Sequence, residues 1–326
     1  MRAWLVREFG PFSEKLEMAD VPPPVAEKGS ALIRVRAAGV NFPDALVIAG
    51  TYQVRPERPF TPGFELVGDV VETGNDCAGV SEGSRVICWT EIGAFKEYVS
   101  VRPEHTFPVP RSMTDAEAAV FLVSYQTAIF SLIHRAGLRA GEVLLVHAGA
   151  GAVGSAAIQL GKVFGATVIA TSSNSNKEAI CRELGADHCV NYSTLNFVKE
   201  VLEITAGRGA DVILDPVGGE IFGDSLRCMA SEGRIIPVGF ASGNIPSVAM
   251  NRVLLKNISI VGFYWGEYWK RDPSLIRATQ LQLNSLYEQG LIRPLTGKIY
   301  RMEELPKALA DLSDRNNYGK NVIKMF

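Results

Sequence analysis

The sequence has almost no net charge and no paired cysteine motif, and these absences weigh against several classes of protein. Its 326 residues carry 33 Lys and Arg against 35 Asp and Glu, a formal net charge of −2. We therefore expect no nucleic acid as the main partner, because nucleic-acid-binding domains gather an excess of positive charge. The five cysteines include no CxxC pair. A chain of this length can fold on its core alone, so we expect reduced thiols in a cytoplasmic protein.

The sequence also lacks an uninterrupted apolar segment of the kind that enters a membrane. Arg7 and Glu8 break the short apolar run near the first residue, so no secretory signal is recognisable. Residues 143–161 contain no charged side chain, but four glycines and two polar residues interrupt them. We expect neither a membrane span nor a membrane partner.

The first hundred residues or so have the pattern of short strands with frequent turns. Residues 31–40 alternate apolar and polar side chains, and residues 63–74 and 83–89 repeat that pattern between glycine-containing turns. Residues 59–63 are too rich in proline for a central strand. We predict an antiparallel, barrel-like region.

A different pattern begins near residue 112. Thr114 and Glu117 form a capping box before an apolar run at 118–133, which predicts a helix. Continuous apolar strands then alternate with helices of about 10–15 residues, and the strands are expected at 143–148, 167–172, 188–192, 211–218, 234–240 and 257–263. This alternation predicts a doubly wound parallel sheet with helices on both faces, so the fold class is α/β.

The clearest motif is a glycine-rich segment between a predicted strand and a predicted helix. Residues 143–154 read VLLVHAGAGAVG and contain GxGxxG at Gly149, Gly151 and Gly154. Gly149 permits a tight turn, Gly151 lets a pyrophosphate approach the backbone, and Gly154 allows close packing of helix against strand. The helix that follows offers free N–H groups to the phosphates. The segment therefore predicts a dinucleotide site.

The next strand ends without the carboxylate that an NAD site usually has. Such a site places Asp or Glu about 20 residues after the glycines, where it accepts the ribose 2′-OH. Here no acidic residue occurs between Gly154 and Glu178, and residues 172–177 read SSNSNK. A charge-assisted bond from Lys177 to a 2′-phosphate is worth about 1.5–3 kcal/mol, so we expect NADPH as the cofactor.

Taken in order along the chain, these motifs resemble the medium-chain dehydrogenase/reductase superfamily, and within it the zinc-independent NADPH:quinone oxidoreductase (zeta-crystallin-like) branch. The segments that carry the resemblance are GVNFPDALVIAGTYQ (39–53), PFTPGFELVGDVVETG (59–74), GSRV (83–86), GEVLLVHAGAGAVGSAAIQLGK (141–162), DPVGG (215–219), GRIIPVGF (233–240) and GKNVIKM (319–325). One departure is visible: the branch usually has AASGGVG where residues 148–154 read AGAGAVG.

The resemblance implies two domains and a homodimer. A GroES-like β-rich catalytic domain would comprise residues 1–122 and 266–326, and a Rossmann NADPH-binding domain would comprise residues 123–265. The strand near 257–263 would pair across a two-fold axis. That strand also has an independent reason to be covered, because an open apolar edge invites aggregation.

The resemblance also implies that no metal is bound. Zinc-dependent relatives have Cys where this chain has Asn41 and His where it has Phe64, so two of the usual three protein ligands are missing. The structural zinc loop of those relatives needs four clustered cysteines, and only Cys88 is near. Without a Lewis acid, reduction of an already electrophilic carbon is favoured over alcohol dehydrogenation.

Site residues follow from the resemblance, position by position. Asn41, Asp44 and Tyr52 are the catalytic candidates, and Phe42 and Phe64 would line the substrate. Either the Tyr52 hydroxyl or water would donate a proton to the acceptor oxygen. The residues expected at the cofactor are Thr127, Gly149, Gly151, Ala152, Val153, Gly154, Ser172, Ser173, Asn174, Lys177, Tyr192, Val238, Gly239, Phe240, Phe263, Tyr264 and Asn321. For Phe240 and Phe263, packing as core aromatics is the alternative.

The expected function is NADPH-dependent reduction of a quinone or a conjugated enone, two substrates that the sequence does not separate. The alternative is a protein that binds NADPH without catalysis and serves as a crystallin, a redox sensor or an RNA-binding protein. A zinc alcohol dehydrogenase is a third hypothesis, which bound metal would revive. No G-x-S-x-G elbow occurs, which disfavours acyl transfer.

Overall fold

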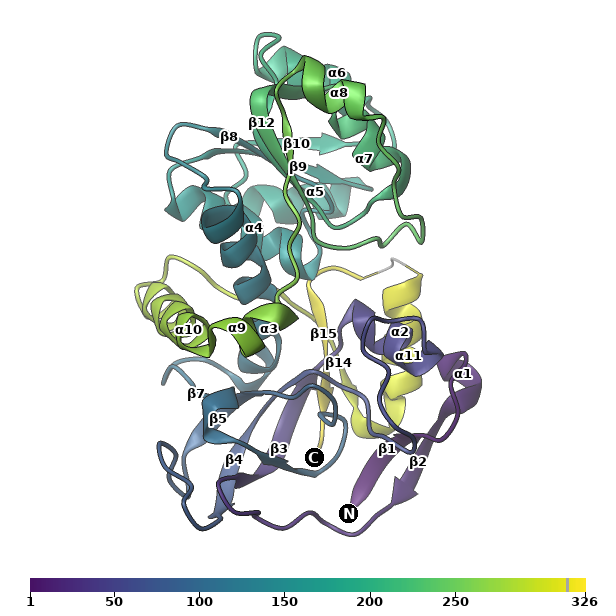
Figure 1. Ribbon diagram of the computed structural model, residues 1–326, viewed down its shortest axis with the longest axis vertical. Helices are drawn as coiled ribbons and strands as arrows, with labels where there is room; N and C mark the ends of the chain where they lie inside the picture. The colour runs from purple at the N-terminus through teal and green to yellow at the C-terminus, as the bar shows by residue number, and fades with distance from the viewer. Residues whose placement is uncertain (315–316) are drawn as a thin grey trace. The chain divides into compact units, whose positions relative to one another are not determined.

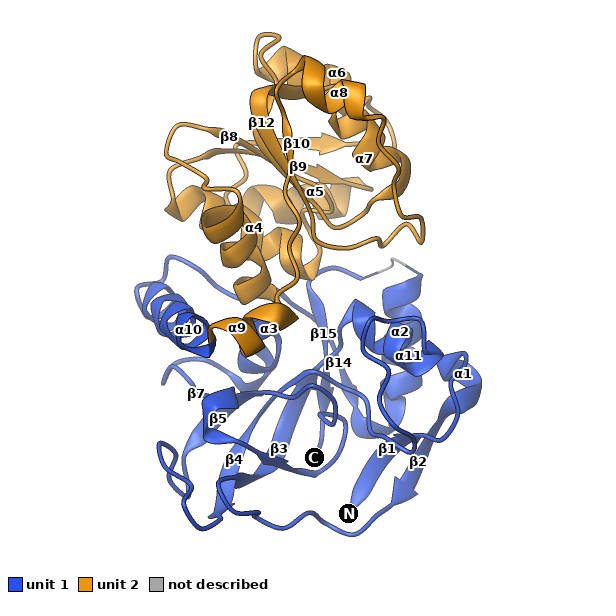
Figure 2. Cartoon of the chain, viewed as in Figure 1, with its two compact units in different colours: residues 1–123, 273–326 blue, residues 124–272 orange. Residues whose placement is uncertain are grey.

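The chain forms two compact units (Figure 2). The structure is a computed structural model that describes residues 1–314 and 317–326. Unit 1 comprises residues 1–123 and 273–326, and unit 2 comprises residues 124–272. The second crossing lies seven residues beyond the predicted one, because α9 (Gly266–Arg271) stays with unit 2. Tyr268 on that helix packs edge to face on Phe130 of the same unit, with ring centroids 4.7 Å apart.

Unit 1 is built on the antiparallel strands that the alternating pattern predicts, with one pair, Thr296–Arg301 and Lys320–Lys324, in parallel. A seven-stranded sheet has the order β14-β15-β3-β4-β5-β7, with β6 also paired to β3. Its strands are β3 (Ala31–Gly39), β4 (Glu65–Thr73), β5 (Arg85–Trp89), β6 (Tyr98–Val101), β7 (Thr106–Pro108), β14 (Thr296–Arg301) and β15 (Lys320–Lys324). A separate two-stranded sheet pairs β1 (Arg2–Val6) with β2 (Leu16–Asp20).

The last strand of the chain completes the sheet of unit 1 (Figure 1). Strand β15 pairs antiparallel with β3, so that Val322 lies opposite Gly39. The helices of this unit are α1 (Phe12–Lys15), α2 (Phe42–Ala49), α10 (Pro273–Glu288) and α11 (Leu305–Ser313), with 3-10 turns η1 (Pro103–His105) and η3 (Met302–Glu304). Residues distant in sequence therefore meet around β3.

The chain passes from unit 1 to unit 2 within α3 (Asp115–Ile129). The predicted capping box is present, because the Thr114 N–H donates to Glu117 Oε2 at 3.0 Å and the Glu117 N–H donates to Thr114 Oγ1 at 3.2 Å. The helix continues as a π-helix, η2 (Phe130–Arg135). Within the described residues, 115–135 is the one helix long and apolar enough to span a membrane, and 78% of its most apolar window is buried inside the protein.

Unit 2 is the doubly wound α/β unit that the second half of the sequence predicts. Its six strands pair in parallel in the order β10-β9-β8-β11-β12-β13. They are β8 (Val143–Val146), β9 (Thr167–Ser172), β10 (His188–Asn191), β11 (Ala210–Asp215), β12 (Met229–Pro237) and β13 (Ser259–Ile260). The helices are α4 (Ala152–Val163), α5 (Ser175–Glu183), α6 (Phe197–Ile204), α7 (Gly219–Ser225), α8 (Met250–Leu255) and α9.

This strand order fixes where a ligand of unit 2 can bind. From β8 the chain builds outward through β9 and β10 on one side, and from β11 outward through β12 and β13 on the other. Open parallel sheets bind ligands at the carboxyl ends of the two strands where the order reverses. That point lies between β8 and β11, so the loops after these strands are the candidates.

Candidate cofactor and substrate sites

The glycine motif forms a tight turn from β8 into α4. A Cβ added to Gly154 would lie 2.2 Å from the Ala148 carbonyl oxygen, and one added to Gly149 would lie 2.8 Å from Cys181 Sγ. Gly151 is the N-cap of α4, and no side chain among the described residues caps that helix. The loop therefore leaves backbone N–H groups of Ala152 and Val153 for an anion, which fits a pyrophosphate.

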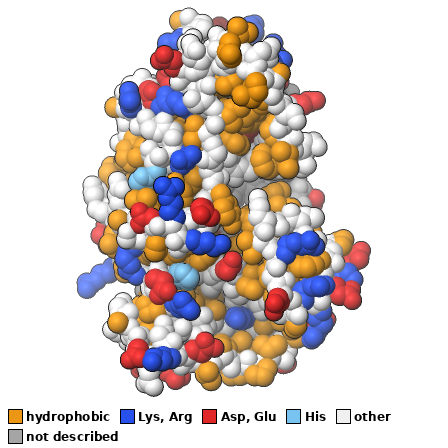
Figure 3. Space-filling view, in the orientation of Figure 1, with side chains coloured by type: hydrophobic (Ala, Val, Ile, Leu, Met, Phe, Trp, Pro, Cys, Tyr) orange, Lys and Arg blue, Asp and Glu red, His pale blue; other side chains and the backbone are white. Residues whose placement is uncertain are grey.

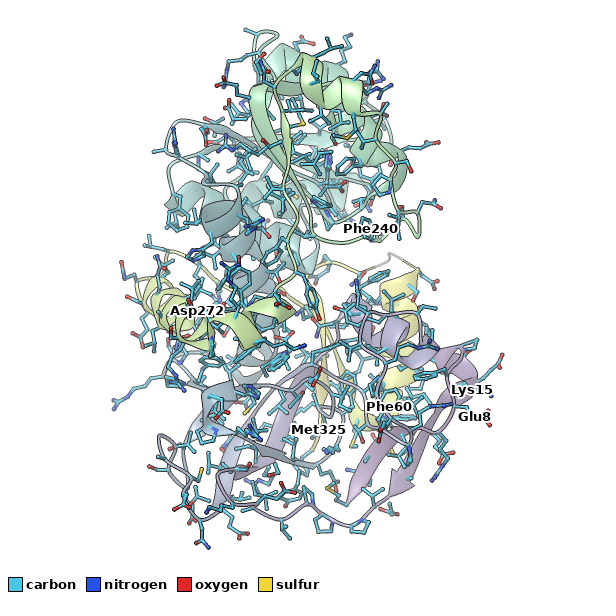
Figure 4. The ribbon with its side chains drawn as sticks, viewed as in Figure 1. Glu8, Lys15, Phe60, Phe240, Asp272 and Met325 are labelled. Atoms are coloured by element: carbon cyan, nitrogen blue, oxygen red, sulfur yellow. The ribbon has the colours of Figure 1, made fainter. Side chains whose placement is uncertain are left out.

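The loops after β11 and β12 lie at the same edge of the sheet. Asp215 Oδ1 accepts the N–H groups of Val217 at 2.7 Å and Gly218 at 3.0 Å, so Asp215 caps its own turn. Burial raises the pKa of this carboxyl. Phe240, which lies on the loop after β12 (Figure 4), has its ring 2.9 Å from where a Gly218 Cβ would be. Packing against the Asp215 turn therefore accounts for this aromatic side chain.

The other two residues of that loop also lie beside this turn. The Val238 N–H donates to the Asp215 carbonyl at 2.9 Å. A Cβ on Gly239 would lie 3.3 Å from the Pro216 carbonyl oxygen. The structure therefore brings the predicted residues Val238, Gly239 and Phe240 to the turn after β11, at the switch point, which is the edge of the sheet between β8 and β11 where the strand order reverses.

The segment expected at a 2′-phosphate lies between β9 and α5. Asn174 caps α5, since its Oδ1 accepts the Lys177 N–H at 2.9 Å, and Lys177 is half-buried in the first turn. Tyr192 follows β10, and its N–H donates to the Ser172 carbonyl at 3.0 Å. Ser173 adjoins this pair. The acidic residue nearest in sequence, Glu178, is paired with Arg182 on the same helix at 2.6 Å.

A cluster of aromatic rings contains the predicted residue Phe263, and two further predicted residues, Thr127 and Tyr264, lie near its members in the sequence. The Phe263 ring stacks on Phe130 of η2 at a centroid distance of 6.4 Å and lies 6.3 Å from Tyr268. Thr127 is half-buried on α3, three residues before Phe130, and the Tyr264 side chain is 45% exposed. Packing therefore accounts for Phe263, whereas Thr127 and Tyr264 keep accessible surface.

His147, just before the glycine loop, is a buried structural residue. Its Nδ1 lies 3.0 Å from Thr171 Oγ1 and its Nε2 lies 2.8 Å from Ser225 Oγ. Burial lowers its pKa to about 3, so the ring is neutral. It joins β8 to β9 and α7 beneath the loop.

Unit 1 contains a buried network of charged and polar side chains. The Lys320 ammonium is paired with the Glu65 carboxylate, and the two side chains are 4% and 0% exposed. Asn41 joins both: its Oδ1 accepts from Lys320 at 2.8 Å, and its Nδ2 donates to Glu65 Oε1 at 3.2 Å. Glu65 Oε2 also accepts the Val123 N–H at 3.0 Å, at the end of unit 1's part of α3. The network therefore connects β4, β15, α2 and α3.

Asp44 lies next to this network and is fully buried. Its Oδ2 accepts the Asn41 N–H at 2.6 Å, which forms one half of a capping box at the start of α2. Burial raises the pKa of Asp44 to about 8, and the negative charge of Glu65 adds to the effect. Asp44 Oδ1 has no hydrogen-bond partner among the described residues.

The aromatic candidates of unit 1 keep more exposure. Tyr52 and Phe64 are half-buried, and their rings meet edge to face with centroids 6.0 Å apart. Phe42 begins α2 and is 36% exposed. These three rings supply an apolar surface beside the buried network.

Three predicted site residues are buried among partners inside unit 1, and their roles toward a ligand stay predictions. Asn41 and Asp44 are 5% and 0% exposed, and the hydrogen bonds described above stay inside unit 1, where they position the start of α2. Asn321 is also 0% exposed; its Nδ2 donates to the Ala308 carbonyl at 3.1 Å, and its Oδ1 accepts the Lys298 N–H at 3.3 Å. The polar groups that we expected to reach ligands hold strands and helices together.

Sequence reasoning missed Glu65 and Lys320, which form the centre of the network. Both lie in segments that the resemblance already contained, PGFE (62–65) and GKN (319–321). The available signal was a charged residue at the first position of a strand in each segment. The sequence carries no indication that residues 255 positions apart would pair.

Comparison with known proteins gives the family. Residues 27–111 match the alcohol dehydrogenase GroES-like domain, and residues 152–280 match the zinc-binding dehydrogenase family. The mouse quinone oxidoreductase-like protein 2 is 38% identical over 313 residues, which cover 96% of this chain and 89% of that protein. The chain belongs to the zinc-independent quinone oxidoreductase branch of the medium-chain dehydrogenase/reductase superfamily.

Solved structures of relatives in this superfamily have the same fold. The quinone oxidoreductase of Thermus thermophilus, solved also as a complex with NADPH, is 32% identical with a TM-score of 0.86, and each chain covers 100% of the other. A mycobacterial protein complexed with NADPH is 30% identical with a TM-score of 0.93 and the same full coverage. The predicted fold class, a GroES-like domain with a Rossmann domain, is confirmed, and relatives in this family bind NADPH.

Within this superfamily the residues of the buried network bear on metal binding. Asn41 and Phe64 stand where zinc-dependent members have ligands, and the Glu65 carboxylate beside them is paired with an ammonium group. No group of three or more His, Cys, Asp or Glu that could hold a metal occurs in residues 1–314 and 317–326. The absence of a bound metal stays a prediction, which metal analysis of the purified protein would test.

Proposed function

We propose that this protein is an NADPH-dependent, zinc-independent reductase of a quinone or an α,β-unsaturated carbonyl. One observation carries the proposal: two features that suit NADPH occur together in unit 2. The glycine loop at the switch point of the sheet leads into a helix with no side-chain cap among the described residues, and the neighbouring segment 172–177 contains no carboxylate. The names of relatives support the reaction class, since they are quinone oxidoreductase-like proteins and quinone oxidoreductases.

The residues of unit 2 would hold the cofactor along one edge of the sheet. Backbone N–H groups at the start of α4 would bind the pyrophosphate, and Lys177 with the Ser172 and Ser173 hydroxyls would bind the 2′-phosphate. Tyr192 would flank the adenosine, and Thr127 would contact the nicotinamide. When bound, NADPH supplies the hydride that reduces the acceptor.

The residues of unit 1 would receive the acceptor. Tyr52, Phe64 and Phe42 offer aromatic side chains that suit a flat, apolar acceptor such as an aromatic or conjugated molecule. The Tyr52 hydroxyl would donate a proton to the reduced acceptor oxygen, with water as the alternative donor. Asn41 and Asp44 would act as positioning residues, because they fix the start of α2 directly before Phe42.

The assembly and the cell compartment are parts of the same proposal. Strand β13 lies at the edge of its sheet with Ile260 38% exposed, and Leu254 and Leu255 on the neighbouring α8 are 73% and 75% exposed. Figure 3 has hydrophobic side chains gathered over α8 on this face. These features support a homodimer through residues 257–263. The scattered cysteines, which contain no CxxC pair, support a cytoplasmic protein with reduced thiols.

The test measures NADPH oxidation by the EDTA-treated protein, with an ortho-quinone and a simple enone as acceptors and NADH as the control. Lys177→Ala should raise the KM for NADPH about 10- to 150-fold, which corresponds to a charge-assisted bond of about 1.5–3 kcal/mol, and leave NADH unchanged. Lys199→Ala is a matched control, because Lys199 has the same place after an Asn cap on α6.

Two outcomes would overturn the proposal. Tight NADPH binding without turnover of either acceptor would favour a non-catalytic NADPH-binding protein. Equal turnover with NADH and NADPH, unaltered by Lys177→Ala, would refute the 2′-phosphate site. The better acceptor of the two would identify the substrate class.

A further inference from the structure

Two of the five cysteines lie together behind the phosphate loop. Cys181 is on α5, and Cys189 is on β10 opposite Ala170 of β9. The Cys181 sulfur and the Ala170 Cβ lie 2.8 and 3.0 Å from the place of a Gly149 Cβ, so the two cysteines are neighbours on one face of the sheet. Helix α5 packs along both β9 and β10 in unit 2. The contact is therefore set by the packing of a helix on its own sheet, rather than by a flexible surface loop.

The two thiols differ in exposure and in reactivity. Cys181 is fully buried, whereas Cys189 is half-buried next to the exposed His188. The hydrogen bond from Cys181 and the positive charge of Arg182 lower the pKa of Cys189, and the same hydrogen bond together with burial raises the pKa of Cys181. A thiolate that is favoured, reachable and in contact with a second sulfur has the properties of an oxidation-sensitive cysteine with its resolving partner.

The buried member of the pair also touches the cofactor loop. Cys181 Sγ lies 2.8 Å from where a Cβ on Gly149 would be, closer than any other atom, so the sulfur fills the space directly behind the first glycine of the motif. Residue 181 is also on the helix whose first turn carries Lys177. A displacement of this sulfur is therefore transmitted to both phosphate-binding segments.

We propose that Cys181 and Cys189 form a reversible disulfide that weakens the binding of NADPH. The oxidant is a peroxide. The Cys189 thiolate attacks one peroxide oxygen, the O–O bond breaks, and Cys189 becomes a sulfenic acid with release of hydroxide. Cys181 sulfur then attacks the Cys189 sulfur and displaces the oxygen as water, while the released hydroxide takes up a proton. Two thiols lose two electrons and two protons, and hydrogen peroxide becomes two waters.

Closing this bond requires movement. A disulfide holds its sulfurs about 2.05 Å apart, far closer than two hydrogen-bonded thiols. Because Cys181 Sγ fills the space behind Gly149, drawing it toward β10 removes contacts that define the loop. Coupling of this kind is reciprocal, so bound NADPH should disfavour the disulfide by the same factor by which the disulfide weakens NADPH.

The chemical step is tested on the whole protein by mass spectrometry. The protein is treated with hydrogen peroxide, blocked with N-ethylmaleimide and digested with trypsin without reduction. Cleavage after Arg182 separates the two cysteines, so the disulfide links the peptide 178–182 to the peptide 183–199. The linked pair should appear in the wild type, disappear with dithiothreitol and be absent from Cys189→Ser. Sulfinic acid on Cys189 without the linked pair would overturn the proposal.

The effect on the cofactor is measured separately, by the fluorescence of bound NADPH. Oxidation should weaken NADPH binding by about tenfold, within the ordinary range of coupling between two sites. Saturating NADPH should make the pair harder to oxidise by the same factor, a shift of about 30 mV in its midpoint potential in a glutathione buffer. A linked pair with unchanged NADPH affinity would overturn the coupling.

Two variants provide the controls. Cys189→Ser keeps a polar group of similar size, so its NADPH affinity should match that of the reduced wild type. Treatment with peroxide should leave that affinity unchanged. Cys77→Ser removes a half-buried thiol of unit 1, and that variant should respond to peroxide as the wild type does. The linked peptides are detected whether or not NADPH binds, so failure of the cofactor site and failure of the disulfide give different results.

Discussion

The buried pair of Lys320 and Glu65 gives a prediction whose size follows from the structure. Among the described residues, Lys320→Met leaves the Glu65 carboxylate without a cation and with the Asn41 amide and the Val123 N–H as donors, at 3.2 and 3.0 Å. Removing one partner of a buried ion pair costs about 3–5 kcal/mol, because the remaining charge stays desolvated. For a unit of about 150–250 residues each kcal/mol lowers the melting temperature by about 2–4 °C, so we expect a fall of roughly 6–20 °C.

The assay follows unit 1 separately, since the two units need not unfold together. Thermal melting gives the overall change, and hydrogen exchange of peptides from β3 and β15 reports the opening of this sheet. The double variant Lys320→Met/Glu65→Gln should recover at least half of the loss, because a neutral pair leaves no uncompensated charge. Arg7→Met is the control: its partner Glu17 is 51% exposed, and breaking this surface pair should cost about 1 kcal/mol or less.

A loss of less than about 1 kcal/mol in Lys320→Met would refute this reasoning, because the Glu65 carboxylate would then need no cation beside it in the interior. So would a double variant no more stable than Lys320→Met, because the cost would then come from lost packing rather than from charge.

Three further predictions follow from other contacts. Gly154→Ala places a methyl group 2.2 Å from the Ala148 carbonyl oxygen, so it should cost about 1–3 kcal/mol in stability and weaken NADPH binding in a fluorescence titration. Gly223→Ala is the control and should bind NADPH normally, because its Cβ would meet no described atom within 4 Å beyond its own helix backbone and chain neighbours. Burial raises the pKa of Asp44 to about 8, so Asp44 binds its proton more tightly in the folded protein than in the unfolded chain. The free energy of unfolding, measured by urea denaturation, should therefore fall from about pH 4 to pH 8, and Asp44→Asn should remove that fall. Tyr52→Phe should lower kcat about 100-fold at unchanged NADPH affinity, and a change of less than about twofold would assign the proton to water.

The sequence predicted those features that depend on neighbours along the chain. The alternation of buried strands and helices gave the parallel sheet, the glycine spacing gave the β8–α4 turn, and Thr114 with Glu117 gave the start of α3. Each of these patterns is local, because the residues that form it lie close together in the sequence.

The sequence could not predict which polar residues the fold would bury. Asn41 and Asn321 have the side chains of ligand-binding residues, yet strand pairing brings them into the interior of unit 1, where backbone and side-chain partners occupy them. The crossing at 272 was also missed, because the aromatic contact that keeps α9 in unit 2 is made with Phe130, far away in the sequence. Long-range packing decides both.

The arrangement of the chain in unit 1 has a consequence for its biosynthesis. Strand β3 and Glu65 leave the ribosome early, but β15 and Lys320, which complete their sheet and their ion pair, come 255 positions after Glu65. At about 5–20 residues per second, this interval lasts roughly 10–50 seconds. Unit 2 is one continuous segment and can fold during that time. Until β15 is synthesised, the first part of the nascent chain therefore exposes an unpaired apolar strand edge and an unneutralised carboxylate. A chaperone would protect the chain during this interval.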